Sequence, residues 1–126
     1  MQKHAVDWFE IPAADLERAV AFYEAIFGFK MHTMELANRL RMAMFPVNPA
    51  ETVGGALCHH PGFYQPSQSG TLVYLNADPD LAVVLARVEK SGGKVMVPKT
   101  QISPEYGYMA VFTDSEGNRV ALHSRG

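Results

Sequence analysis

Apolar residues recur at intervals of three and four in two segments of the chain, and this spacing predicts two amphipathic helices. The first segment spans residues 15–27, and the second lies near residues 80–90. Gly28 and Gly93, each placed where a glycine can end a helix, are 65 residues apart, about half the length of the 126-residue chain. The chain therefore repeats one pattern in its two halves.

Strand-like runs flank both predicted helices in the same order. One run precedes each helix and three follow it: 4–11, then 29–36, 39–47 and 53–59; and 70–76, then 94–98, 107–113 and 118–124. A linker rich in Pro, Gly, Ser and Gln, about 61–69, joins the halves. We predict a single α+β domain over residues 1–126. It consists of two tandem βαβββ modules, about 1–62 and about 68–126, which form a curved mixed sheet around a cleft.

The composition narrows the classes of function. Hydrophobic residues make up 48% of the chain, enough for one compact core. The net charge is -2 and no basic run occurs, which argues against a nucleic-acid partner. No apolar stretch reaches the roughly 18 to 20 residues of a membrane span, and no secretory signal opens the chain. Cys58 is the single cysteine, so no internal disulfide can form, and we expect a cytoplasmic protein.

Several motifs resemble those of a known superfamily. They are Trp8-Phe9-Glu10-Ile11-Pro12, Asp15 to Ala19 leading to Phe22-Tyr23, Phe27-Gly28-Phe29, Gly92 to Thr100, and Gly107 to Asn118. In order and spacing the chain resembles the vicinal oxygen chelate superfamily, the glyoxalase, bleomycin-resistance and dioxygenase group. The nearest subgroup is the short bacterial proteins related to lactoylglutathione lyase. This resemblance implies a small-molecule ligand and a homodimer in which chains pair or exchange modules.

Metalloenzymes of this superfamily hold a divalent ion, such as Zn, Ni, Mn or Fe, with four side chains from the first and last strands of each module. The resemblance maps those places to Val6, Ala56, Thr71 or Leu72, and Ala121. None is a strong ligand, so we predict that the metal places are vacant. A shift of one residue in this alignment would bring Asp7 or Cys58 nearer to a metal position. A shifted site would use His4, Glu10 and His123, unless the two histidines are half-exposed surface residues.

Glu10 is the candidate catalytic residue, because a carboxylate on a strand can act as a base or accept a ligand hydrogen bond. Alternatively, Glu10 faces solvent or pairs with an arginine such as Arg41. Trp8 lies two residues before Glu10 and therefore shares its face of the strand. The remaining candidates for ligand binding, each with core packing or a plain linker role as its alternative, are Met42, His60, Tyr74, Tyr106, Tyr108 and Phe112. The connection from Lys99 to Tyr106 is a candidate binding loop.

Two functions fit these observations. The first is an enzyme, a lyase or isomerase of glyoxalase type that acts on a small oxygen-rich metabolite. The second is a non-catalytic protein of the bleomycin-resistance kind, which sequesters a small aromatic or cationic compound. A dimeric interaction module without a ligand is a third reading. The sequence does not decide between catalysis and binding.

Overall fold

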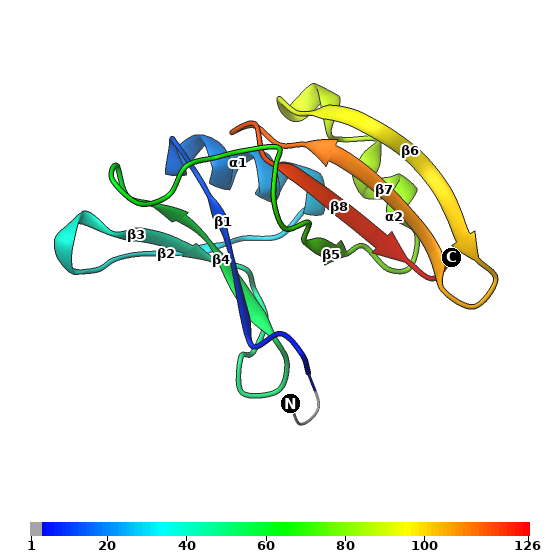
Figure 1. The fold of residues 1–126 in the computed structure, drawn as a ribbon, viewed down its shortest axis with the longest axis horizontal. Coiled ribbons are helices and arrows are strands. Elements are labelled where there is room, and N and C mark those ends of the chain that lie inside the picture. Colours follow the sequence, from blue (N-terminus) through cyan, green and yellow to red (C-terminus); the bar gives the residue numbers. More distant parts are fainter. Residues whose placement is uncertain (1–3) are drawn as a thin grey trace.

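The computed structural model describes residues 4–126 and contains two modules with the same order of elements (Figure 1). Module 1 consists of β1 (Trp8–Pro12), α1 (Leu16–Phe27), β2 (His32–Glu35), η1 (Ala37–Arg39), β3 (Arg41–Met44) and β4 (Gly54–His59). Module 2 consists of β5 (Tyr74–Asn76), α2 (Leu81–Leu85), η2 (Glu89–Ser91), β6 (Lys94–Ser103), β7 (Gly107–Thr113) and β8 (Arg119–Ser124). The predicted α+β fold with two βαβββ modules is confirmed.

Each module forms its own four-stranded mixed sheet, with the strand orders β1-β4-β3-β2 and β5-β8-β7-β6. The first strand of each module pairs in parallel with the last, and the other neighbours are antiparallel. This arrangement places β4 between β1 and β3, and β8 between β5 and β7. The middle of each sheet is therefore built from the strand that the chain forms last.

The first helix follows the prediction closely, and the second is shorter than predicted. Asp15 caps α1 by accepting a hydrogen bond from the Arg18 backbone amide (3.1 Å), and Gly28 ends it with a φ of 74°. In module 2 the regular helix stops at Leu85, and η2 follows after a turn. Two β-branched residues, Val83 and Val84, lie inside this short helix, and such residues have low helix propensity.

The expected binding loop from Lys99 to Tyr106 is largely strand, and this prediction was wrong. β6 runs to Ser103 and pairs with β7 along its whole length. Irregularities in the pairing, between Val95 and Val97 and between Val97 and Thr100, accommodate the extra residues of β6. Only a short turn connects the two strands.

The helix-facing sides of both sheets share one core around α1. Phe22 and Tyr23 of α1 are buried, and the ring of Phe22 lies 5.9 Å from that of Phe112 on β7. Tyr23 also contacts Phe45, which follows β3, with ring centroids 5.6 Å apart. Because one helix supplies aromatic rings to both sheets, the helix-facing sides of the two modules form a single core.

A buried polar network reinforces this shared core. The Tyr23 hydroxyl donates to Oδ2 of Asp114, 2.7 Å away, and Asn118 Nδ2 donates to the same carboxyl and to the Pro12 carbonyl (2.7 Å). Asp114 is 3% exposed. Burial raises the pKa of Asp114, while hydrogen bonds from Asn118, Tyr23 and the Glu116 amide oppose the shift. The network joins α1 of module 1 to the β7–β8 turn of module 2.

Replacing Tyr23 by phenylalanine removes the only donor that α1 gives to Asp114 and keeps the ring in the core. A buried polar group left short of a partner costs about 1–3 kcal/mol, and we expect the free energy of unfolding to fall by that amount. Urea unfolding of the variant measures the change. Tyr106→Phe, at a position 67% exposed, is the matched control. An equal effect of the two substitutions would contradict the role of the network.

Candidate functional site

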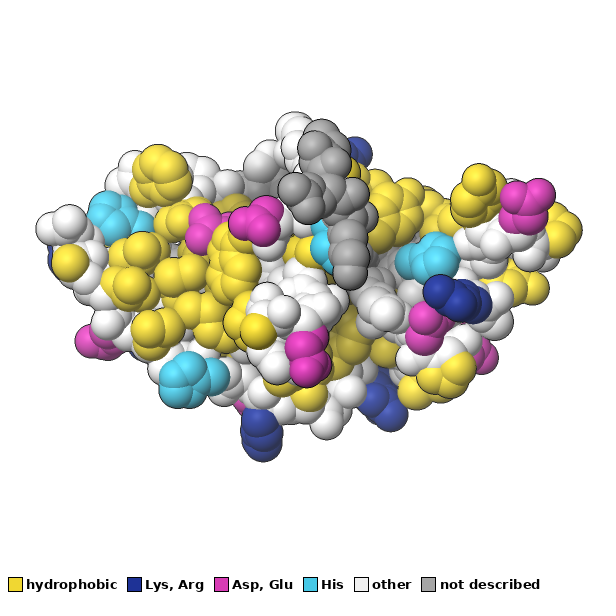
Figure 2. Space-filling model, turned by 90° about the horizontal axis from the view of Figure 1, so that it is seen from below, with side chains coloured by type: hydrophobic (Ala, Val, Ile, Leu, Met, Phe, Trp, Pro, Cys, Tyr) yellow, Lys and Arg dark blue, Asp and Glu magenta, His cyan; other side chains and the backbone are white. Residues whose placement is uncertain are grey.

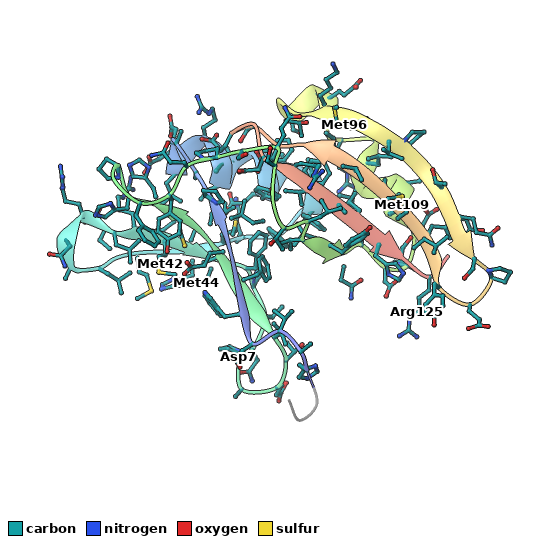
Figure 3. All side chains as sticks on the ribbon, viewed as in Figure 1. Asp7, Met42, Met44, Met96, Met109 and Arg125 are labelled. Atoms are coloured by element: carbon teal, nitrogen blue, oxygen red, sulfur yellow. The ribbon has the colours of Figure 1, made fainter. Side chains whose placement is uncertain are left out.

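One face of the module 1 sheet is turned away from α1, and we call it the open face of module 1. In the register of the strands, Glu10 lies opposite Ala56, and Ala56 lies opposite Met44. Partners in neighbouring strands carry their side chains on the same face, whereas the alternate residues point to the core. The face consists of Trp8 and Glu10 on β1, Met42 and Met44 on β3, and Gly54, Ala56 and Cys58 on β4; Figure 3 shows the two methionines.

Small side chains follow β4 along the middle of this face. Gly54, Ala56 and Cys58 alternate along the strand, with longer side chains on β1 and β3 to either side. A Cβ atom at Gly54 would lie 3.2 Å from the Trp8 ring, so the absence of a side chain lets the indole lie over the strand. Figure 2 shows apolar side chains gathered on this side of the molecule, with acidic side chains and histidines around them.

Glu10 is held in place by two donors. Nε1 of Trp8 donates to one carboxylate oxygen at 3.2 Å, and the hydroxyl of Tyr64 in the linker donates to the other through a short hydrogen bond. Arg41, the partner considered from the sequence, instead pairs with Glu17 of α1 and Glu35 of β2. In residues 4–126 no ion pair involves Glu10. Its carboxylate therefore stands on the open face without a cationic partner.

The linker residue Tyr64 completes this site, and the sequence did not single it out. Its ring packs against Met42, Ala56 and Cys58, and burial together with the bond to Glu10 raises the pKa of its hydroxyl well above the usual value. Linker residues show no periodicity, so no pattern signals a contact with β1. The adjacent aromatic pair Phe63-Tyr64 in an otherwise polar linker was the one available signal.

Cys58 lies beneath these groups and is fully buried. Burial raises the pKa of its thiol to about 12, and the nearby charge of Glu10 adds to the shift. A thiol nucleophile reacts as the thiolate, which this environment disfavours at neutral pH. Cys58 therefore serves the site as a small apolar surface.

Two further candidates lie on the corresponding face of module 2. Tyr74 on β5 is opposite Ala121 on β8 and is 50% exposed. His123 on β8 has its Nε2 2.6 Å from the carbonyl oxygen of Tyr106, which lies in the exposed β6–β7 turn. Neither Tyr74 nor Tyr106 has a hydrogen bond to Glu10 or Trp8 in the described part of the chain. The candidates from the two modules therefore belong to separate sheet faces.

Tyr108 and Phe112, which we expected to contact a ligand, do not lie on an open face, and the structure does not bring them together with Glu10. Along β7 the residues alternate between faces, and both of these point toward the helices. Phe112 is fully buried in the shared core, and Tyr108 is half-buried beneath Nζ of Lys99, 4.5 Å from its ring centroid. His60 begins the linker, where its Nδ1 accepts a hydrogen bond from the Gly62 amide (3.1 Å). It lies beyond the end of β4.

The side chains do not fit the divalent metal that the fold implies. Ala56 and Ala121 lie on the middle strands of the open faces and offer no donor atom, while Val6 and the segment 71–72 precede the first strand of their modules. The shifted site is also not formed: within residues 4–126, His4, Glu10 and His123 do not assemble into a group of three ligands. We therefore assign no chemical step to a metal.

This arrangement of modules places the chain in a known family. Residues 5–122 match the model of the Glyoxalase/Bleomycin resistance protein/Dioxygenase superfamily, and the chain belongs to that superfamily. A "Glyoxylase-like domain-containing protein" from Didymella fabae is 32% identical over 122 residues, which is 92% of this chain and 90% of that protein. The chain is thus a glyoxalase-like domain. No helix among the described residues is long and apolar enough to cross a membrane.

Solved structures share the fold. A glyoxalase I mutant from Zea mays superposes with a TM-score of 0.74 at 21% identity over 94% of this chain, which spans only 46% of the maize chain. A glyoxylase/bleomycin resistance protein/dioxygenase domain from Frankia sp. EAN1pec gives 0.70 at 16% identity, covering 98% of both chains. The trypanothione-dependent glyoxalase I of Leishmania major gives 0.70 at 15%, covering 98% of this chain and 88% of that one.

Alanine substitutions at the adjacent glycines of β4, Gly54 and Gly55, test which face of the sheet is open. At Gly55, on the core side, an added Cβ would lie 2.3 Å from the ring of Phe9, so Gly55→Ala overpacks the core and should lower the free energy of unfolding by about 1–3 kcal/mol. Gly54→Ala presses only against Trp8 and Val47 and should change the fluorescence of Trp8, the single tryptophan, more than the stability. Urea unfolding followed by fluorescence measures both. The opposite order of the two stabilities would mean that the register is wrong.

Proposed function

We propose that this chain binds a small organic molecule on the open face of module 1, with Glu10 as the polar contact. The observation that carries the proposal is a carboxylate that forms no ion pair within residues 4–126 and is positioned by Trp8 and Tyr64 among apolar and sulfur-containing side chains. Ligand sites are mostly apolar surfaces with a few placed polar groups, which matches this composition. Methionines such as Met42 and Met44 adapt to irregular ligands.

A homodimer belongs to the same proposal. The chain exposes 7637 Å², whereas a compact monomer of its mass exposes roughly 6700 Å². Part of the excess is apolar and lies on the two open faces, where Trp8, Met34, Tyr74 and Val97 are each more than a third exposed. We infer that a second copy covers these faces, so that module 1 of one chain and module 2 of the other enclose the ligand. A cytoplasmic location completes the proposal, supported by the single buried Cys58.

Catalysis is the second candidate, with Glu10 as the general base of a lyase or isomerase. What favours it is the position of the carboxylate on an apolar face, where a base can take a proton from a bound molecule. The glyoxalase I proteins with the same fold make this reaction type worth testing. Loss of turnover in Glu10→Gln with retained ligand binding would separate catalysis from binding alone.

Light scattering at micromolar concentration tests the homodimer, and we expect about twice the mass of the 13.9 kDa chain. Replacing exposed Met34 of β2 by glutamate adds a charge to the open face and should shift the mixture toward monomer. Val83→Glu, on the exposed side of α2, is the control. A monomer at all concentrations would refute the pairing of chains.

Trp8 reports on the binding site without any label. We expect a ligand found in a metabolite panel by thermal shift to change the fluorescence of Trp8 on titration. Glu10→Gln removes a charge-assisted hydrogen bond worth about 1.5–3 kcal/mol, so the ligand should bind roughly ten- to a hundredfold more weakly. Glu51→Gln, at an exposed carboxylate of the same module, should have no effect. Equal affinities of the two variants would exclude Glu10 as the contact.

A further inference from the structure

Tyr64 fills part of the face on which the proposed function depends. It belongs to the linker and not to the sheet: a turn at His60, whose carbonyl accepts hydrogen bonds from the amides of Phe63 and Tyr64 (3.2 and 3.3 Å), directs it there. The linker is next fixed at Ser67, whose amide donates to the Asn118 side chain of module 2 at 3.1 Å. Between these two points, Tyr64 is the residue that packs on the open face of module 1.

The contacts of Tyr64 indicate which chemical groups a ligand on this face would need. Its ring lies against Met42, Ala56 and Cys58, the apolar part of the face, and its hydroxyl reaches Glu10. An ionised carboxylate only accepts hydrogen bonds, so whatever replaces the hydroxyl must be a donor. The second oxygen of Glu10 accepts a hydrogen bond from Nε1 of Trp8, so the oxygen that Tyr64 now contacts is the one that a ligand donor would take over.

We propose that Tyr64 occupies the position of the ligand and that the ligand is a phenol-type molecule, an aromatic ring with a hydroxyl donor, which displaces this side chain. The inference rests on the proposed function, since it names the class of molecule bound on the same face. An anionic ligand is disfavoured because Glu10 would repel it and no cation within residues 4–126 forms an ion pair with Glu10. A ligand must compete with Tyr64, so its apparent affinity for the natural chain equals its intrinsic affinity multiplied by the fraction of molecules in which Tyr64 has left the face.

Removing the side chain should convert the self-occupied site into a binding site for the missing group. In Tyr64→Ala, 4-methylphenol supplies the deleted phenol ring together with one additional methyl group, and 4-methylanisole has a similar shape without the donor. We expect 4-methylphenol to bind this variant about tenfold or more tightly than 4-methylanisole, and more tightly than it binds the natural chain. Trp8 fluorescence and thermal shift both measure the affinities.

Two controls separate the site from its surroundings. Phe63→Ala removes a neighbouring ring that is 74% exposed and opens no space beside Glu10, so it should not improve binding of 4-methylphenol. Adding Glu10→Gln to Tyr64→Ala should reduce the preference for the phenol over the methyl ether. Tyr64→Phe removes only the hydrogen bond to Glu10, so its ring still fills the site but is more easily displaced. If Tyr64→Ala does not fold, Tyr64→Phe should show the same preference for the phenol, with a smaller gain over the natural chain.

The outcomes distinguish this inference from the proposed function. Equal binding of the phenol and its methyl ether would overturn the ligand class and leave binding on this face intact. A ligand from the metabolite panel that depends on Glu10, combined with no gain for 4-methylphenol in either Tyr64 variant, would overturn the role of Tyr64 alone. Ligands that bind without any dependence on Glu10 would instead refute the proposed function.

Discussion

The aromatic core around α1 is the constraint on which the rest of the structure depends. Phe22 and Tyr23 are buried between the two sheets. Tyr23 contacts Phe45 of module 1, and Phe22 contacts Phe112 of module 2. Each sheet must therefore turn one face to the helices. Since side chains alternate along a strand, the residues between those core positions are forced onto the opposite face, and any function on a sheet has to be located there.

The open face of module 1 combines small, long and polar side chains from three strands and the linker. Small residues along β4 allow Trp8 and Tyr64 to lie over the strand, and the longer side chains of β1 and β3 border it. One carboxylate, Glu10, supplies the polarity. Its two oxygens are each committed to a donor from a different element, Trp8 from the same strand and Tyr64 from the linker between modules. The hydrogen bonds to Glu10 therefore orient the rings of Trp8 and Tyr64, and the same bonds hold the carboxylate in position.

Membership of the superfamily is compatible with alanine at positions 56 and 121, because the fold and the open faces depend on different residues. The fold is maintained by core positions and by the Tyr23, Asp114 and Asn118 network, none of which lies on an open face. Ala56 on β4 and Ala121 on β8, where the resemblance led us to expect metal ligands, satisfy the packing of the sheets. A fold can thus keep its architecture while the chemistry of its open faces changes.

Part of this protein followed from the sequence alone. The period of apolar residues determined α1, and the repeat of elements determined the two βαβββ modules, because both are local patterns. The alternation along β1 also placed Trp8 and Glu10 on one face. Only the tertiary structure decided that Phe112 is a core residue, since a strand pattern does not say which of its faces meets a helix. The contact of Tyr64 with Glu10 joins residues 54 positions apart through an irregular linker, and only the folded chain brings such groups together.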